Sequence, residues 1–189
     1  MELRGSSTSR LGHRCREEAN SGFSGVVGLI ARAGMAALFL MLPLASLAGT
    51  LTGVVVGISD GDTLMLLDST NAQHKIRLAG IDAPEKRQAF GDRSKQALAG
   101  LVFQKQVIVE WSKLDRYGRV IGKVLLGSDD ICLAQVRAGL AWHYKTYERE
   151  QSPFDRERYA QAELEARAGK RGLWRDPAPT APWDFRHHR

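Results

Sequence analysis

Residues 75–85 read KIRLAGIDAPE, an apolar run that carries one arginine and ends in two carboxylates on either side of a proline. Two shorter motifs flank this stretch: SDGDT at residues 59–63 and LDRYGR at residues 114–119. Each motif sets isolated acidic or basic side chains beside turn residues, with apolar runs before and after it. This arrangement indicates charged groups that are held where β-strands end.

The runs around the motifs have the composition of short β-strands. Some runs are rich in Val, Ile and Thr, and in others apolar residues alternate with polar ones. Asp60-Gly61 provides a tight turn between the first two runs. Pro84 prevents the third strand from continuing, because proline has no N–H to donate to the ladder. The expected strands cover residues 50–58, 63–67, 74–78, 106–111 and 120–126.

Three helices are expected between and after these strands. Asp92 is a candidate N-cap for the first helix, and Asp129 or Asp130 for the second. Five strands with a helix after the third favour an α+β fold with a mainly β core, a five-stranded OB-fold barrel with three helices, although other small α+β folds share this order. The expected helices run from Asp92 to residue 102, from 131 to 138 and from 155 to 168.

The first 48 residues have the pattern of an export signal. Basic residues precede a short apolar run, residues 35–48, which ends in small side chains. The run is shorter than the roughly 20 apolar residues of a transmembrane span. We expect a signal cleaved after Ala48, with an uncleaved membrane anchor as the alternative, and hence an exported protein, secreted or periplasmic. Residues 49–175 then form one domain, and residues 176–189 form a C-terminal tail.

The net charge gives a weak indication of the binding partner, and the cysteine content bears on disulfides. The formal net charge of +6 suggests an anionic partner, although solvated basic faces are common. Cys15 would be removed with the leader, and Cys132 lies inside an apolar run, which indicates a buried thiol. A framework of disulfides is therefore excluded.

Each motif taken alone has an ordinary interpretation. The acidic pairs can be explained by turn formation or by the start of a helix, and the arginines by solvated strand faces. The occurrence of all three motifs in one chain favours a catalytic site instead. Oxygen ligands, a carboxylate base and two guanidinium groups are what a metal-assisted attack on a phosphodiester requires.

The three motifs in this order resemble the staphylococcal-type nuclease (thermonuclease) family. The likeness extends from about residue 50 to residue 174 and includes VRAGLA at residues 136–141 and KRGLW at residues 170–174. The resemblance implies an OB-fold barrel that hydrolyses DNA and RNA with Ca²⁺ and with little sequence specificity. We expect a monomer without a stable protein partner, and membrane contact only if the leader is retained.

The resemblance also implies a role for each acidic residue. Asp62 and Asp82 correspond to the metal carboxylates of the family, and the backbone carbonyl of Ala83 to a third ligand. These are hard oxygen ligands, which suit Ca²⁺ better than a soft metal. Glu85 corresponds to the proposed general base that activates water.

Arg77 and Arg119 correspond to the two arginines that grip the phosphate. A planar guanidinium can hold two oxygens at once, which a lysine cannot do. Negative charge gathers on the equatorial oxygens in the transition state, so these groups would stabilise it most at that point.

Aromatic residues complete the substrate-binding set. Tyr117 resembles a residue near the bound terminal phosphate, with Arg116 beside it. Tyr144 and Tyr147 could stack on a base or contact a phosphate. Their segment, residues 142–152, reads as irregular and is shorter than in the family, and packing in the core is an equal alternative for Tyr144.

Two other functions remain open besides the nuclease. An OB barrel of this lineage could bind nucleic acid or a protein without cutting, or the acidic residues could serve only to form turns in a structural domain. Loss of metal carboxylates or arginines would be expected in a degenerate relative. This chain keeps all five candidate side chains, which favours the enzyme.

Overall fold

The structure, a computed structural model, describes residues 49–187. The expected export signal, residues 1–48, lies outside the described part of the chain. The described residues belong to one structural unit with a single main hydrophobic core. No helix among them is long and apolar enough to cross a membrane.

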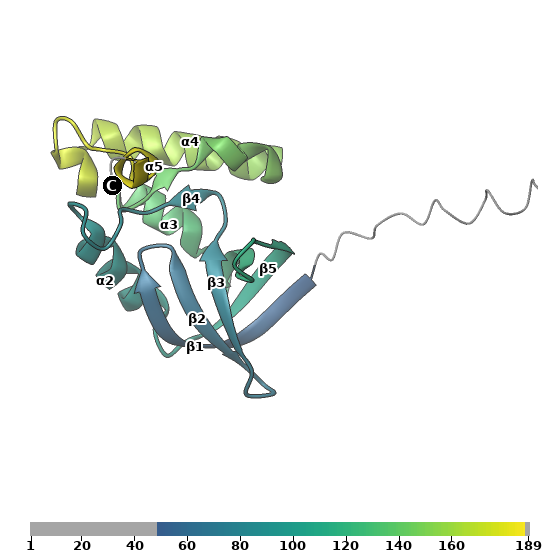
Figure 1. Cartoon of the computed structure of the whole chain (residues 1–189). Helices are drawn as coiled ribbons and strands as arrows, with labels where there is room; N and C mark the ends of the chain where they lie inside the picture. The colour runs from purple at the N-terminus through teal and green to yellow at the C-terminus, as the bar shows by residue number, and fades with distance from the viewer. Residues whose placement is uncertain (1–48, 188–189) are drawn as a thin grey trace, which may run out of the picture. The chain divides into compact units, whose positions relative to one another are not determined.

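Five strands close into a barrel (Figure 1). The parallel pairing of the third and the sixth strand closes the ring, with Ile76 opposite Val120. The other pairings in the ring are antiparallel: β1 (Gly49–Asp60) pairs with β2 (Thr63–Asp68) and β5 (Gln106–Leu114), β2 pairs with β3 (Gln73–Leu78), and β5 pairs with β6 (Val120–Leu126). The barrel expected from the sequence is confirmed.

Alternation along the strands separates the inside of the barrel from the outside. In β5, Val107 and Val109 are buried, whereas their neighbours Ile108 and Glu110 are exposed. Side chains of a strand point to opposite faces in turn, so every second residue of β5 joins the core. The register of β1 on β2 shifts after Val55, and such a bulge lets one long strand bend to pair on both sides.

Three longer helices cover the barrel: α2 (Gly91–Val102), α3 (Ile131–Arg137) and α4 (Pro153–Ala168). Asp130 caps α3, as expected, since its side chain accepts a hydrogen bond of 3.0 Å from the N–H of Leu133. The expectation of Asp92 as N-cap is wrong. Phe90 holds that position with a φ of 67° and no side-chain cap, and Asp92 lies in the first turn, where its charge still favours the helix dipole.

Short elements build the end of the barrel where the motifs meet. The strand β4 (Ile81–Asp82) pairs with β8 (Trp142–His143), and a 3₁₀ helix, Lys145–Glu150, follows. The segment 142–152 is therefore more ordered than its sequence suggested. Figure 1 shows α4 on the same side of the barrel as β4, together with α5 (Pro182–His187) from the C-terminal tail. Within residues 49–187, the remaining short elements are β7 (Asp129–Asp130) and a 3₁₀ helix at Gly172–Arg175.

Candidate active site

The turn between β1 and β2 gives its two aspartates different tasks. The N–H of Asp62 donates to the side chain of Asp60 at 3.2 Å, which stabilises the turn. The side chain of Asp62 is buried and accepts from the Thr63 hydroxyl at 3.1 Å and from the N–H of Ala83 at 2.6 Å. Asp62 is thereby tied to the segment that carries the second motif.

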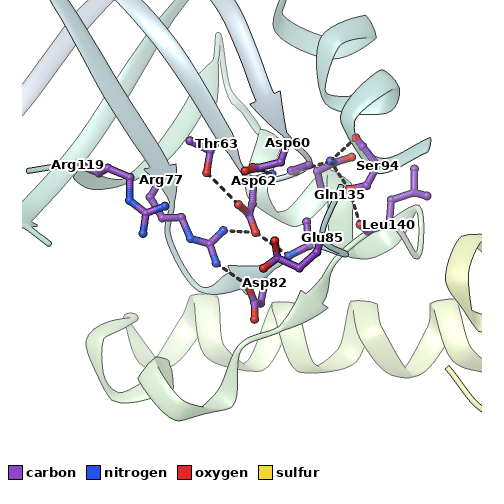
Figure 2. A network of polar contacts seen from close by, with 12 residues as sticks. Asp60, Asp62, Thr63, Arg77, Asp82, Glu85, Ser94, Arg119, Gln135 and Leu140 are labelled. Atoms are coloured by element: carbon purple, nitrogen blue, oxygen red, sulfur yellow. Dashed lines mark hydrogen bonds and ion pairs between the residues drawn. The ribbon is translucent and has the colours of Figure 1, made fainter. Parts of the chain in front are cut away.

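Buried polar contacts hold this turn against the helices. The amide of Gln135, in α3, donates to the carbonyl of Gly61 at 2.8 Å and to the carbonyl of Ser94 at 3.1 Å. Ser94, in α2, donates its hydroxyl to the carbonyl of Leu140 at 2.7 Å (Figure 2). A Cβ at Gly61 would come within 1.8 Å of the Ser94 hydroxyl, so only glycine fits there. Nothing in the sequence around Gln135 and Ser94 marks them as residues of the site, because their partners are distant in the chain.

Asp82 reaches the same place through a sharp reversal after β3. Gly80 adopts a φ of 73°, a conformation that glycine enters without steric cost, and the chain then runs into β4. The pairing of Asp82 with Trp142 in β8 fixes its backbone. The side chain of Asp82 is almost fully buried, with 1% exposure.

Arg77 bridges the two buried aspartates, as Figure 2 shows. Its Nη1 forms an ion pair with Asp62, and its Nη2 donates to Asp82 Oδ1 at 2.6 Å. Burial lowers the pKa of Arg77, and the negative charge of Asp82 opposes this effect. The two carboxylates therefore face one point that already carries positive charge.

Glu85 lies at the edge of the same cluster and is more open to solvent. Its side chain is 32% exposed, which leaves room for a water molecule to approach. Its Oε1 accepts a hydrogen bond of 2.8 Å from Arg186, a residue of α5. Arg186 also pairs with Asp82 at 2.7 Å. The sequence does not mark Arg186 as a residue of the site, because it lies in the expected C-terminal tail, residues 176–189.

Arg119 approaches the cluster from the third motif. Its Nε donates to Asp115 at 2.6 Å, which orients the guanidinium beside that of Arg77 (Figure 2). Burial alone would raise the pKa of Asp115, but hydrogen bonds from Arg119 and from the N–H of Tyr117 outweigh it and hold this pKa below its usual range. Asp115 is therefore a charged support for Arg119.

All ten residues predicted for the site line one cavity of about 1060 Å³. Tyr117 is 74% exposed at the rim, and the guanidinium of Arg116 lies 5.7 Å from its ring. Tyr147 is 46% exposed, whereas Tyr144 stacks on Trp183 with ring centroids 5.4 Å apart. The residues in question are Asp62, Arg77, Asp82, Ala83, Glu85, Arg116, Tyr117, Arg119, Tyr144 and Tyr147.

The donor atoms fit a hard divalent cation. Within residues 49–187, no group of three or more His, Cys, Asp or Glu side chains is arranged to hold a metal. Two buried carboxylates, Asp62 and Asp82, do converge on the guanidinium of Arg77. A cation in that position would need further oxygens from backbone carbonyls or water, which is usual for Ca²⁺ and Mg²⁺.

Comparison with known proteins places this site in a family. Residues 75–176 match the family model described as staphylococcal nuclease homologue. An uncharacterized endonuclease of Haemophilus influenzae is 46% identical over 132 residues, which cover 70% of this chain and 71% of that protein. The micrococcal nuclease of Shigella flexneri is 42% identical over 144 residues, covering 71% of this chain and 79% of that protein. Protein ParB of Escherichia coli is 42% identical over 146 residues, covering 72% of this chain and 79% of that protein.

The chain belongs to the staphylococcal nuclease family. The closed five-stranded barrel with its helices agrees with this family's fold. Membership makes the protein a nuclease, a hydrolase that acts on nucleic acid, and the family depends on a metal ion.

Proposed function

We propose that the protein is a calcium-dependent endonuclease that hydrolyses DNA and RNA with little sequence specificity. The observation that carries this proposal is the convergence of three separated motifs on one cavity, with two buried carboxylates bridged by Arg77. Base pairs are read by polar groups that match the edges of the bases. The charged groups of this cavity suit a phosphate instead, so sequence should matter little.

Asp62 and Asp82 are the residues that would hold the ion, with the carbonyl of Ala83 as a further ligand. When bound, Ca²⁺ supplies a positive charge that stabilises the developing charge on the phosphate. Arg77 pairs with both carboxylates, and its guanidinium is the group that would donate to the phosphate beside them. Loss of such a preorganised donor typically costs about 10²–10³ in rate.

Glu85 is the residue proposed to take a proton from the attacking water. It is the most exposed of the three acidic side chains and lies next to Asp82 through their shared partner Arg186. Arg119 would donate to the phosphate from the other side of Arg77, in an orientation that Asp115 fixes. Water attack with no covalent enzyme intermediate needs no Ser or Cys nucleophile.

Export is the second part of the proposal. The basic lead and the apolar run at residues 35–48 support a secretory signal, and an exported enzyme would meet Ca²⁺ and foreign nucleic acid outside the cytoplasm. Fractionation of cells that produce the full chain tests this part. Recovery of all nuclease activity in the cytoplasm would contradict it.

The activity can be tested with the purified full-length chain on plasmid, denatured DNA and RNA. Each substrate is incubated with Ca²⁺, Mg²⁺ or a chelator. We expect cleavage of all three substrates in Ca²⁺ and none with chelator. Glu85→Gln should lose activity, while Glu157→Gln, an exposed change of the same kind on α4, should keep it. Equal cutting by the two variants would exclude Glu85 as the base, and binding without cutting would indicate the non-catalytic alternative.

A further inference from the structure

The C-terminal helix α5 brings a third arginine onto the acidic residues of the site. Nη2 of Arg186 donates to Asp82 Oδ2 at 2.7 Å, and Nη1 lies 3.3 Å from Asp82 Oδ1 and 2.8 Å from Glu85 Oε1. Arg186 thus grips Asp82 with both nitrogens and touches Glu85 as well. The predicted acidic residues and arginines of the site come from the three motifs, whereas Arg186 comes from a different part of the chain, α5.

Apolar packing, and not only this ion pair, holds the segment around Arg186 in place. The ring of Trp183 stacks on Tyr144 at an angle of 13° and meets Trp142 edge to face at 5.4 Å. Ala181 and Pro182 are buried. The side chain of Gln88 donates to the carbonyl of Thr180 at 2.6 Å. Residues 180–187, called the C-terminal strap below, are therefore docked through residues 180–183 as well as through Arg186.

The strap takes the oxygen atoms that a metal would need. Arg77 and Arg186 together occupy both oxygens of Asp82, and the side chain of Asp82 has only 1% exposure. A divalent cation bound to Asp82 would face the Arg186 guanidinium across a few ångströms of a partly buried site. Like charges at that distance repel strongly. Arg186 and the cation cannot both hold Asp82 in this way.

The strap also covers two groups proposed to act on the substrate. Arg186 donates a hydrogen bond to Glu85, the proposed general base. Trp183 stacks on the ring of Tyr144, where a nucleobase of the substrate could otherwise stack. Both contacts come from the same helix, so a movement of the strap would release them together. The strap therefore contacts three groups at once: the proposed metal ligand Asp82, the proposed general base Glu85 and the ring of Tyr144.

We propose that the C-terminal strap is an autoinhibitory element, in which Arg186 competes with the metal ion for Asp82. The inference rests on the proposed function, since it takes Asp82 as a metal ligand. The enzyme is then less sensitive to Ca²⁺ with the strap docked, and Ca²⁺ or substrate must displace Arg186 to complete the site. Binding of the cation and docking of the strap oppose each other by the same factor.

Calorimetric titration of Ca²⁺ into the full-length chain without nucleic acid tests this competition. Arg186→Met should bind Ca²⁺ more tightly than the wild type, by up to about five-fold, which corresponds to the free energy of a partly exposed ion pair. Arg175→Met is the matched control: it removes the same charge from an exposed residue at the end of the 3₁₀ helix Gly172–Arg175, which does not line the cavity, and its affinity should equal that of the wild type.

Trp183→Ala separates the strap from the simple loss of charge. This variant keeps Arg186 but loses the stacking that docks the strap, so its Ca²⁺ affinity should also rise. Equal or weaker binding by Arg186→Met than by Arg175→Met, with Ca²⁺-dependent cleavage intact, would overturn the inference and leave the proposed function standing. A rise in Ca²⁺ affinity for Arg186→Met but not for Trp183→Ala would also contradict the autoinhibitory role of the strap. Absence of Ca²⁺ binding in all the proteins would overturn both proposals.

Discussion

Arg77 and Asp82 are joined by a hydrogen bond of 2.6 Å although a strand end and a chain reversal separate them. The bond exists because β3 ends at Leu78 and Gly80 turns the chain back toward the strand it has left. A second nitrogen of the same guanidinium pairs with Asp62. One side chain therefore bridges the two carboxylates that are proposed to hold the metal.

Replacing Arg77 by Lys should reduce cleavage by about 10²–10³-fold, because an ammonium cannot bridge two groups or grip two phosphate oxygens. The measurement is the initial rate of plasmid cutting at saturating Ca²⁺. Lys75→Gln, an exposed change on the same strand, is the control and should leave the rate within about two-fold. A rate above half that of the wild type in Arg77→Lys would show that charge alone suffices there.

Gln135→Leu should weaken the response to Ca²⁺. Gln135 is fully buried and is the support for the carbonyl of Gly61, in the turn that presents Asp62. Loss of groups that orient metal ligands typically costs about 10–100-fold in metal affinity or activity. The rate should therefore fall at low Ca²⁺ and recover in part at high Ca²⁺, as measured by a Ca²⁺ titration of the cleavage rate. Gln96→Leu, on the exposed face of α2, serves as the control. An unchanged Ca²⁺ titration for Gln135→Leu would mean that the turn at Gly61 keeps its conformation without this hydrogen bond.

Gly139→Ala should destabilise the protein more than Gly127→Ala. Both glycines have a φ near +60°, which costs an L-residue about 1–2 kcal/mol. A Cβ at Gly127 meets nothing within 4 Å, but at Gly139 it would lie 2.3 Å from the carbonyl oxygen of Arg171. Urea unfolding should show a loss above about 3 kcal/mol for Gly139→Ala and close to the strain cost for Gly127→Ala. Equal losses would mean that the chain around Arg171 can move aside.

Tyr159→Phe should lower the free energy of unfolding by about 1–3 kcal/mol. The buried hydroxyl of Tyr159 lies 2.9 Å from Asp130 Oδ2, and Asp130 in turn caps α3 and lies 3.5 Å from Lys123. Without the hydroxyl, a buried carboxylate loses a donor. Chemical denaturation measures the change, and Tyr117→Phe, at a residue with 74% exposure, should leave stability within about 0.5 kcal/mol. A neutral Tyr159→Phe would indicate that Lys123 satisfies Asp130 unaided.

Local signals were enough to predict the barrel. The strand at residues 120–126 has the predicted bounds, because its alternation and the turn before it are encoded in neighbouring residues. The capping of α3 by Asp130 is equally local. The same reasoning failed at α2, since Asp92 looks like a cap but the chain enters that helix through Phe90 with a positive φ.

Contacts between distant parts of the chain could not be predicted. The strand β8 forms because Trp142 pairs with Asp82, and nothing in residues 142–152 alone encodes this partner. Gln135 and Arg186 are ordinary polar residues in the sequence. They contact Gly61 and Asp82 only after α3 packs on the barrel and the tail folds back. The motifs located the cavity, but not the elements that support and cover it.

Stability above pH 9 should depend on Cys132. Burial raises the pKa of this thiol from 9.0 to about 12, so the folded chain keeps a proton that the unfolded chain releases. Cys132 thus contributes stability that is fully present below the unfolded pKa and is lost as the pH rises toward 12. While only the unfolded thiol is ionised, each pH unit removes about 1.4 kcal/mol.

Urea unfolding of the wild type and of Cys132→Ala between pH 7 and pH 10.5 isolates this effect, because the other titrating groups are common to both proteins. Cys132→Ala differs by a constant amount up to about pH 8, from the cavity it creates. Above pH 9 the advantage of the wild type should shrink by about 1.4 kcal/mol per unit. If the two curves stay parallel to pH 10.5, the folded thiol ionises as readily as the unfolded one, and the burial of Cys132 has no electrostatic consequence.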